Sequence, residues 1–197
     1  MTADRRRRLI EVAAAEFAGQ GYENASLNTI IALCPMSKSS FYYLFESKAD
    51  LFDFVVTELL TVLARTVTVP APQEFAGGAF WERVEALFAG MARAAEHDES
   101  LVDLGRMFYS AAPEGARGTV SSTVDAARDW VQEVLRVGRD TGAVRDDLPE
   151  SLQCELTFGL LQIFDRWSVN HLDARDAAAA RDLTAAQFAA LKRLLAP

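Results

Sequence analysis

Apolar side chains recur every three or four positions along most of the chain, which is the spacing of one face of an α-helix. Near the start, Leu9, Ala13 and Phe17 are each one turn apart and predict a helix over residues 4–20. Similar stripes predict further long helices over residues 47–65, 79–97, 99–112, 119–141, 149–170 and 184–195. No segment shows the two-residue alternation of a convincing strand, so the pattern predicts an all-α protein.

Segments rich in Pro and Gly separate the predicted helices and mark loops or turns, at residues 69–78, 113–118 and 142–148. The Asp-, Arg- and Ala-rich segment 171–182 is expected to be only partly ordered. Thr184 is expected to cap the final helix, because its hydroxyl can accept a hydrogen bond from a free backbone N–H.

Residues 26–51 carry the most specific pattern, which predicts three short helical starts with sharp breaks between them. Ser26 is a suitable N-cap for the first helix. Pro35 ends that helix, because the residue before a proline is disfavoured in the α conformation. Ser47 opens the third helix, and Asp50 stands three residues later, at the spacing of a capping box.

The second of these helices, which Ser37 can cap, has two different faces. Phe41 and Phe45 lie one turn apart and are expected to point inward. The opposite side carries side chains that can donate hydrogen bonds, from Lys38, Ser39, Tyr42 and Tyr43. Because such groups bind phosphates and base edges, the helix is expected to enter a groove of DNA.

Charge is unevenly distributed along the chain, whose net charge is −8. Residues 1–48 carry six basic and five acidic side chains, whereas residues 49–197 carry 14 basic and 23 acidic ones. The acidic part would repel DNA and the first part would not. We therefore expect modest non-specific affinity for DNA, with specific contacts contributing more than bulk charge.

Four consecutive arginines, at positions 5–8, precede or open the first helix. They form either an arm that touches phosphates or enters the minor groove, or an ordinary solvated helix end. In the first interpretation, Arg5 and Arg6 are the expected DNA contacts.

Composition narrows the class of protein further. Half of the 197 residues are apolar, yet no apolar run approaches the roughly 20 residues of a membrane span, and the N-terminus lacks the apolar region of a signal peptide. Cys34 and Cys154 are far apart and not in metal-ligand spacing, which favours a reducing cytoplasm. Cys34 is interpreted as a small buried residue rather than a redox switch, and His97 as part of a solvated helix end. We expect no metal and no cofactor.

A set of positions at fixed spacing spans two helix breaks in the first quarter of the chain: Phe17, Gly21, Tyr22, Ala25, Ser26, Leu27, Ile30, Ala32, Ser37, Lys38, Phe41, Tyr42, Tyr43, Phe45, Ser47, Lys48 and Leu51. This set resembles the DNA-binding region of the TetR family of transcriptional regulators. The resemblance implies a homodimer that binds a palindromic operator and is released from double-stranded DNA by a small-molecule effector. It implies a helix-turn-helix domain over residues 1–48 and a helical effector-binding and dimerisation domain over residues 49–197.

Carried over residue by residue, the resemblance places DNA contacts on and around the second short helix, at Ser26, Ser37, Lys38, Ser39, Ser40, Tyr42, Tyr43 and Lys48. Ser26 and Lys48 fall at helix N-termini, whose free N–H groups attract phosphates. Lys38 contacts either a guanine edge or a phosphate.

The chain departs from the family pattern in two places. The family usually has Ala-Gly in the turn, where this chain has Cys34 and Pro35. Because proline cannot adopt the positive φ of glycine, this turn is expected to differ locally. Leu44 replaces a usual Tyr or His, which removes one polar group beside the DNA.

The remaining helices carry more large apolar side chains than one small bundle needs. A largely apolar effector pocket is expected to draw on Trp81, Phe88, Met107, Phe108, Trp130, Phe158 and Gln162, although each aromatic alone is more often plain core. The last two helices are expected to pair with those of a second copy, through Leu156, Ile163, Trp167, Phe188, Leu191 and Leu195. Gln162, Asp165 and Arg166 either orient a ligand or pair across the dimer.

These features predict a ligand-responsive transcriptional regulator, most simply a repressor, and not an enzyme. The sequence contains no phosphate loop, dinucleotide fingerprint, Gly-x-Ser-x-Gly elbow or cysteine pair. The alternative is a helical interaction protein, or a small-molecule-binding protein, without sequence-specific DNA binding.

Overall fold

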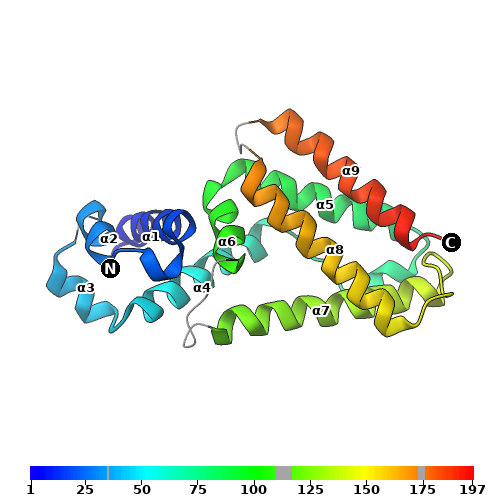
Figure 1. The fold of residues 1–197 in the computed structure, drawn as a ribbon, viewed down its shortest axis with the longest axis horizontal. Helices are drawn as coiled ribbons and strands as arrows, with labels where there is room; N and C mark the ends of the chain where they lie inside the picture. Colours follow the sequence, from blue (N-terminus) through cyan, green and yellow to red (C-terminus); the bar gives the residue numbers. More distant parts are fainter. Residues whose placement is uncertain (35, 110–116, 173–175) are drawn as a thin grey trace. The chain divides into compact units, whose positions relative to one another are not determined.

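The computed structural model describes residues 1–34, 36–109, 117–172 and 176–197 (Figure 1). In chain order the elements are α1 (Ala3–Asn24), α2 (Leu27–Leu33), α3 (Lys38–Leu44), α4 (Lys48–Thr66), the short 3-10 helix η1 (Pro72–Ala76), α5 (Phe80–His97), α6 (Glu99–Tyr109), α7 (Arg117–Asp140), α8 (Glu150–His171) and α9 (Ala177–Leu195). No strand occurs among the described residues, and the all-α prediction is confirmed. Pro35 and most of the turn predicted at 113–118 lie outside the described residues.

The helices group into two compact units. The first contains Met1–Leu63 and Asp98–Ser122, and the second contains Ala64–His97 and Thr123–Pro197. The first unit is larger than the predicted DNA-binding segment, because it includes most of α4 and also α6, which packs against α1. The predicted functional boundary at residue 48 stays a prediction.

Aromatic rings form the centre of the first unit. Phe17 of α1 is fully buried and meets Phe52 of α4 edge to face, with 5.1 Å between ring centroids. Tyr22 stacks on Phe17 at 6.0 Å. Such pairs stabilise a core beyond the area that they bury. The first helix continues past its predicted end to Asn24, through a kink at Gly21, whose φ of 72° is open to glycine at little steric cost.

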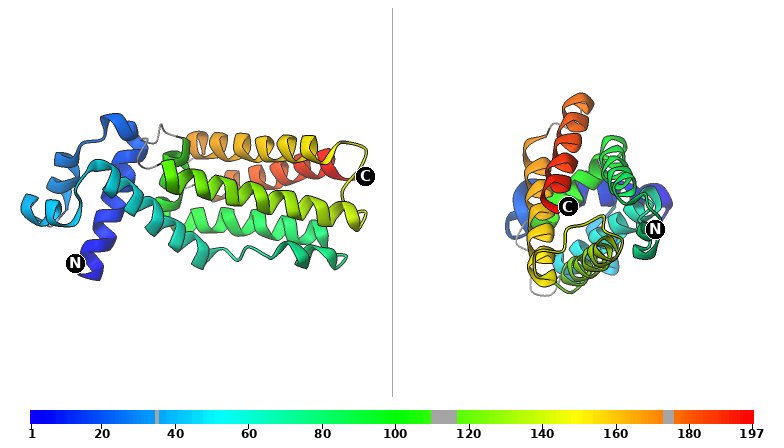
Figure 2. Two further views of the ribbon diagram at one scale, coloured as in Figure 1. Left: turned by 90° about the horizontal axis from the view of Figure 1, so that it is seen from below. Right: turned by 90° about the vertical axis from the view of Figure 1, so that its right-hand side faces the viewer.

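The second unit is a bundle of α5, α8, α9 and the larger part of α7 (Figure 2). Burial of apolar surface holds it together. Its buried core consists of Phe75, Phe80, Val84, Val131, Val134, Leu135, Val137, Val144, Cys154, Phe158, Leu191 and Leu195. The segment 69–78, predicted as a loop, contains η1, which brings the Phe75 ring to 5.6 Å from Phe80 and 5.8 Å from Trp130.

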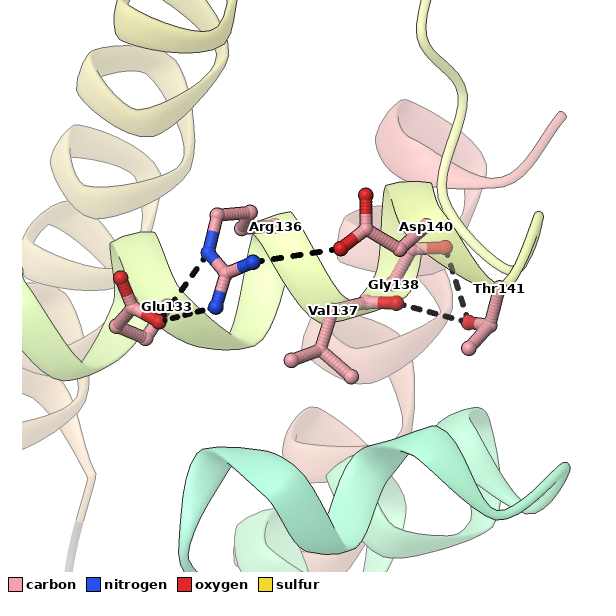
Figure 3. Close-up of polar contacts among 6 residues, drawn as sticks. All are labelled: Glu133, Arg136, Val137, Gly138, Asp140 and Thr141. Atoms are coloured by element: carbon pink, nitrogen blue, oxygen red, sulfur yellow. Dashed lines mark hydrogen bonds and ion pairs between the residues drawn. The ribbon is translucent and has the colours of Figure 1, made fainter.

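Polar contacts close the C-terminal end of α7 (Figure 3). Arg136 forms ion pairs about one turn away on either side, with Glu133 at 2.8 Å and with Asp140 at 3.4 Å. The Thr141 hydroxyl donates to the carbonyl of Val137 at 2.9 Å. This bond supplies a partner to one of the carbonyls that a helix end leaves unpaired.

A buried polar network fixes the loop between α7 and α8. The Gln153 side chain is only 1% exposed. Its amide donates to the carbonyl of Arg145 at 2.9 Å, and its oxygen accepts from Arg139 at 2.9 Å. Arg139 also donates to the carbonyl of Leu148 at 2.9 Å. Because each buried polar group in this set has a partner, the network holds the loop in one conformation.

The last helix is longer than predicted. It begins at Ala177, and Asp176 is its N-cap, with the carboxylate accepting from the N–H of Ala179 at 2.9 Å. Thr184, the predicted cap, lies inside the helix and donates to the carbonyl of Ala180 at 2.8 Å. The prediction for this segment was wrong because the four alanines at 177–180 have high helix propensity, and that propensity extends the helix towards the N-terminus.

Gly138 of α7 should tolerate no side chain. A Cβ built on Gly138 would lie 2.5 Å from the nearest Val144 methyl carbon and 2.7 Å from the Phe80 ring. We expect Gly138→Ala to lower the free energy of unfolding by about 1–3 kcal/mol, since overpacking forces neighbouring groups off their rotamers. Urea denaturation followed by circular dichroism measures this change.

Gly19→Ala is the matched control. Gly19 lies within α1, and a Cβ there would meet no atom within 4 Å. The same substitution should therefore stabilise the protein, by up to about 1 kcal/mol, because alanine favours the helix. Equal effects of Gly138→Ala and Gly19→Ala would contradict the close packing described for α7.

Candidate nucleic-acid interface

The helices α2 and α3 begin at the predicted caps. The Ser26 hydroxyl accepts from the N–H of Thr29 at 3.3 Å, and the N–H of Ser26 donates to the Glu16 carboxylate at 2.9 Å. The Ser37 hydroxyl accepts from the N–H of Ser40 at 3.1 Å. These bonds satisfy N–H groups that a helix start leaves free, and so they set where each helix begins.

The start of α4 is closed by a reciprocal pair of bonds. The Ser47 hydroxyl accepts from the N–H of Asp50 at 3.1 Å, as the capping-box spacing predicts. The Asp50 carboxylate accepts in return from the N–H of Glu46, also at 3.1 Å. The return bond thus reaches one residue further back than in the usual capping box.

Phenylalanine rings fix the orientation of α3. Phe41 is fully buried and Phe45 is 7% exposed, so both point inward as predicted. The two ring centroids lie 5.4 Å apart, and Phe45 lies 5.2 Å from the ring of Phe54 on α4. Because packed rings have few alternative arrangements, these contacts hold the opposite face of α3 in a defined position.

The opposite face of α3 is open to solvent. Lys38, Ser39 and Ser40 are exposed, and the side chains of Tyr42 and Tyr43 are 53% and 90% exposed. The Tyr42 ring packs edge to face on the ring of Phe41, with 5.4 Å between the ring centroids. This face combines one cation with four hydroxyl groups, of which those of Ser39 and Ser40 hydrogen-bond to the Ser37 hydroxyl at 3.0 and 2.9 Å. Ammonium and hydroxyl groups are suited to phosphates and base edges.

A hollow of about 460 Å³ lies between the start of α1 and α3. It is lined by Met1, Arg5, Met36, Ser39, Ser40, Tyr43 and Leu44. The sequence indicated Arg5 and the α3 residues separately, and the fold brings them together. Leu44 is 42% exposed, so the position where the family usually has a polar residue is an apolar surface patch here.

The four arginines at positions 5–8 have different surroundings. Arg5 lines the hollow beside α3. Arg6 donates through Nε to the Glu58 carboxylate at 2.7 Å, and this neighbour raises the pKa of the Arg6 guanidinium. Arg7 donates to the Asp4 carboxylate at 3.4 Å, and Arg7 and Arg8 make longer contacts with Glu11, at 3.9 and 3.7 Å.

Lys48 is engaged inside the first unit. Its ammonium donates to the carbonyls of Glu23 at 2.9 Å and Ala25 at 3.2 Å, and it lies 4.8 Å from the centre of the Tyr22 ring. These contacts tie the start of α4 to the end of α1. A phosphate contact by Lys48 stays a prediction.

The two cysteines are free and buried. Burial raises the pKa of the Cys34 thiol, and Cys34 is 7% exposed at the end of α2. A buried thiol with a raised pKa reacts slowly with oxidants, which agrees with a packing role.

The residues expected to line an effector pocket divide between the two units. Met107 and Phe108 belong to the first unit, where Met107 is fully buried. The second unit contains the other five, Trp81, Phe88, Trp130, Phe158 and Gln162. Of these, Phe158 is buried in the core, and the three others with aromatic rings are partly buried against it. A pocket among these residues stays a prediction.

The residues expected at a dimer interface also divide into two sets. Leu156, Ile163 and Trp167 of α8 are 44%, 54% and 48% exposed. Leu191 and Leu195 of α9 are instead only 4% and 3% exposed, inside the core of their own unit. The ring of Phe188 is partly buried against the same core. A second copy is therefore not needed to cover Leu191 and Leu195.

Two other features are absent from the described ranges. No helix in them is long and apolar enough to cross a membrane. The same ranges hold no group of three or more His, Cys, Asp or Glu side chains placed for a metal ion. His97 is exposed on the last turn of α5, with Nδ1 2.7 Å from the carbonyl of Arg93.

A capped helix pair with a solvent-facing second helix is the arrangement of a helix-turn-helix DNA-binding domain. Residues 9–55 match the family described as bacterial regulatory proteins, tetR family. The predicted resemblance is thereby confirmed: the first quarter of the chain carries the DNA-binding region of the TetR family, and the chain has the fold of TetR-family regulators. Among curated proteins, none matches the sequence significantly.

Solved structures with this fold cover nearly the whole chain. The ketosteroid transcriptional regulator KstR2 of Mycobacterium tuberculosis is 20% identical, with a TM-score of 0.72 over 100% of this chain and 97% of that chain. The TetR-family regulator PfmR from Thermus thermophilus is 20% identical, with a TM-score of 0.69 over 94% and 97%. The fatty acid degradation regulator FadR from Bacillus halodurans is 16% identical, with a TM-score of 0.64 over 92% and 97%.

Proposed function

We propose that this protein is a cytoplasmic, ligand-responsive repressor that binds a palindromic operator as a homodimer. The observation that carries the proposal is the outer face of α3, which is rigidly backed by Phe41 and Phe45 yet covered by nothing within the described unit. A face of this kind, within a match to the tetR family, is suited to reading a DNA groove.

The recognition helix α3 would contact DNA through its exposed donors. Lys38, Ser39 and Ser40 lie at its start, and Tyr42 and Tyr43 follow on the outer side. The tyrosine hydroxyls are suited to phosphates, which fix the position of the helix without reading sequence. Ser39 and Ser40 are short enough to approach base edges closely. Ser26, Ser37 and Arg5 would add contacts at the margins of this surface.

The two copies would pair through α8. Leu152, Leu156, Ile163 and Trp167 recur at helical spacing along α8, and each is at least 44% exposed. Apolar stripes of this length on one helix are typical of protein interfaces, since isolated chains seldom leave them in water. A symmetric dimer covers the same stripe on both copies at once.

A small, largely apolar effector would bind in the second unit. Trp81, Phe88 and Trp130 are partly buried beside its core, and Gln162 offers a polar group on the same helix as Phe158. Two solved structures with this fold are described as a ketosteroid transcriptional regulator and a fatty acid degradation regulator, which supports an apolar effector.

Release would follow from movement of α4, which runs without a break from residues of the first unit into residues of the second. Two recognition helices must match half-sites at a fixed spacing, so a shift of a few ångströms weakens the fit. The effector must bind the released form more tightly than the DNA-bound form. Titration of candidate compounds, with tryptophan fluorescence and operator affinity measured together, tests this mechanism. A compound that binds tightly without changing operator affinity would contradict it.

Two substitutions of Tyr42 distinguish the contribution of its hydroxyl to operator binding from that of its ring. We expect Tyr42→Phe to weaken operator binding about tenfold, because it removes a hydrogen bond to a charged phosphate and keeps the packing on Phe41. Tyr42→Ala should weaken binding further, with the protein still folded. Fluorescence anisotropy with a labelled operator measures both affinities. Wild-type affinity in both variants would exclude Tyr42 from the interface.

A further inference from the structure

We propose that Glu58 is a positioning residue for DNA binding: by pairing with Arg6 it keeps one cation at the start of α1 from contacting DNA. The inference rests on the proposed DNA binding by α3 and its neighbours. It assigns a role to a residue of α4, outside the helix-turn-helix, which acts on DNA only through Arg6.

The pair has the geometry of a fork. Arg6 Nε lies 2.7 Å from one carboxylate oxygen of Glu58, and Nη2 lies 2.5 Å from the other. Two parallel bonds of this kind orient the guanidinium more strictly than a single contact does. The neighbouring Arg7 approaches Asp4 at 3.4 Å and Glu11 at 3.9 Å, and Arg8 approaches Glu11 at 3.7 Å. Among the four arginines, Arg6 thus has the most closely bound carboxylate.

The guanidinium of Arg6 also contacts an aromatic ring. Its central carbon lies 5.5 Å from the centre of the Phe54 ring, one helical turn before Glu58 on α4. Phe54 in turn packs on Phe45, which supports the recognition helix. One face of α4 therefore offers Arg6 both a carboxylate and a ring, and stacking with a cation adds to the ion pair.

The pair changes the charge that DNA meets. Residues 1–48 carry only one more basic than acidic side chain, so one engaged arginine is a large part of their balance. A DNA phosphate would have to displace a carboxylate that is already in place, at a high effective concentration. Low non-specific affinity follows, and a larger share of the binding energy then depends on the contacts of α3.

The Arg6–Glu58 pair is partly exposed to solvent, so DNA can reach it. The Arg6 side chain is 50% exposed and that of Glu58 is 22% exposed. Partly exposed pairs contribute little to folding, so removing one partner should leave the unit folded. An effect of Glu58 on DNA binding can then be separated from an effect on stability.

A double-mutant cycle on a generic duplex measures the effect. Wild type, Glu58→Gln, Arg6→Gln and the double variant are titrated with one labelled random-sequence duplex at several salt concentrations. Glu58→Gln should steepen the dependence of log K on log salt by about 0.9, the value for one added phosphate contact, and should raise affinity about eightfold in 0.1 M salt. Arg6→Gln and the double variant should keep the wild-type slope.

Two controls distinguish pairing from bulk charge and from misfolding. Glu11→Gln removes the same charge from the same unit, beside Arg7 and Arg8, and should leave the slope unchanged. Glu58→Asp keeps the negative charge, so its DNA affinity and salt dependence should stay close to those of the wild type. Circular dichroism checks the fold of each variant. A single variant leaves one partner of the pair without its counter-charge and could unfold for that reason, whereas the double variant leaves no unpaired partner.

Several outcomes would overturn the role of Glu58. A dependence of log K on log salt that is shallower by about 0.9 in Arg6→Gln than in the wild type would mean that Arg6 already contacts phosphate in the wild type. If Glu58→Gln changes DNA binding no more than Glu11→Gln does, the loss of one negative charge explains the change and the pairing with Arg6 does not. If the wild type selects an operator but Glu58→Gln neither steepens the salt dependence nor raises the affinity, the role of Glu58 is wrong and the proposed function stands. A wild type that binds no duplex contradicts both.

Discussion

Ile163→Glu is expected to dissociate the proposed homodimer and to lower operator affinity by roughly a hundredfold or more, because each monomer then engages a single half-site. Ile163 is 54% exposed in the single chain, at the centre of the α8 stripe. In the proposed interface its side chain would be covered by the second copy. A carboxylate placed there would lose its hydration without gaining a partner, which costs several kcal/mol for each copy.

Sedimentation velocity and operator titration at equal protein concentration measure the two consequences. Ser151→Glu is the matched control, since it places the same charge on the same helix, at an exposed position outside the stripe. A carboxylate in the first turn of a helix is favoured by the helix dipole, so this variant should remain dimeric and bind as the wild type does. An Ile163→Glu protein that stays dimeric would place the interface elsewhere.

Phe41→Ala is expected to lower the free energy of unfolding of the first unit by roughly 3–5 kcal/mol. The Phe41 ring is fully buried, and it contacts Phe45 at 5.4 Å and Tyr42 at 5.4 Å between ring centroids. Alanine would leave a cavity beneath a helix of seven residues. So short a helix depends on tertiary packing for its stability, so the loss should also disorder α3 and abolish DNA binding.

Urea denaturation of the full-length protein, followed by circular dichroism, measures the loss. Tyr43→Ala is the matched control on the same helix, because its ring is 90% exposed and supports no core contact. Its effect on stability should stay within about 0.5 kcal/mol. Similar losses in the two variants would mean that Phe41 is not the anchor of α3.

Local patterns in the sequence predicted the parts of the fold that depend on neighbours within a few residues. Ser26, Ser37 and Ser47 were predicted as helix caps, and each hydroxyl accepts the expected bond. Phe41 and Phe45 were predicted to point inward, and both are buried. A cap or a helical face is set by spacings of three or four residues, and those spacings are visible in the sequence.

Contacts between distant segments could not be predicted in the same way. Arg6 and Glu58 are 52 positions apart, and nothing in their spacing indicates that they meet. The apolar stripe of α9 showed that one face is buried, but not that Leu191 and Leu195 find their cover within the same chain. Periodicity identifies the apolar face of a helix but not the element that covers this face, since many helices offer similar apolar surfaces.

The proposed sequence-selective DNA binding by a homodimer is tested most directly by selection of bound duplexes from a random pool, at moderate salt. The protein is first unfolded, dialysed and refolded, so that no effector carried through purification remains. An enriched palindrome with two half-sites about one or more helical turns apart is the expected result. A refolded, dimeric protein that enriches no sequence would contradict the proposed operator binding.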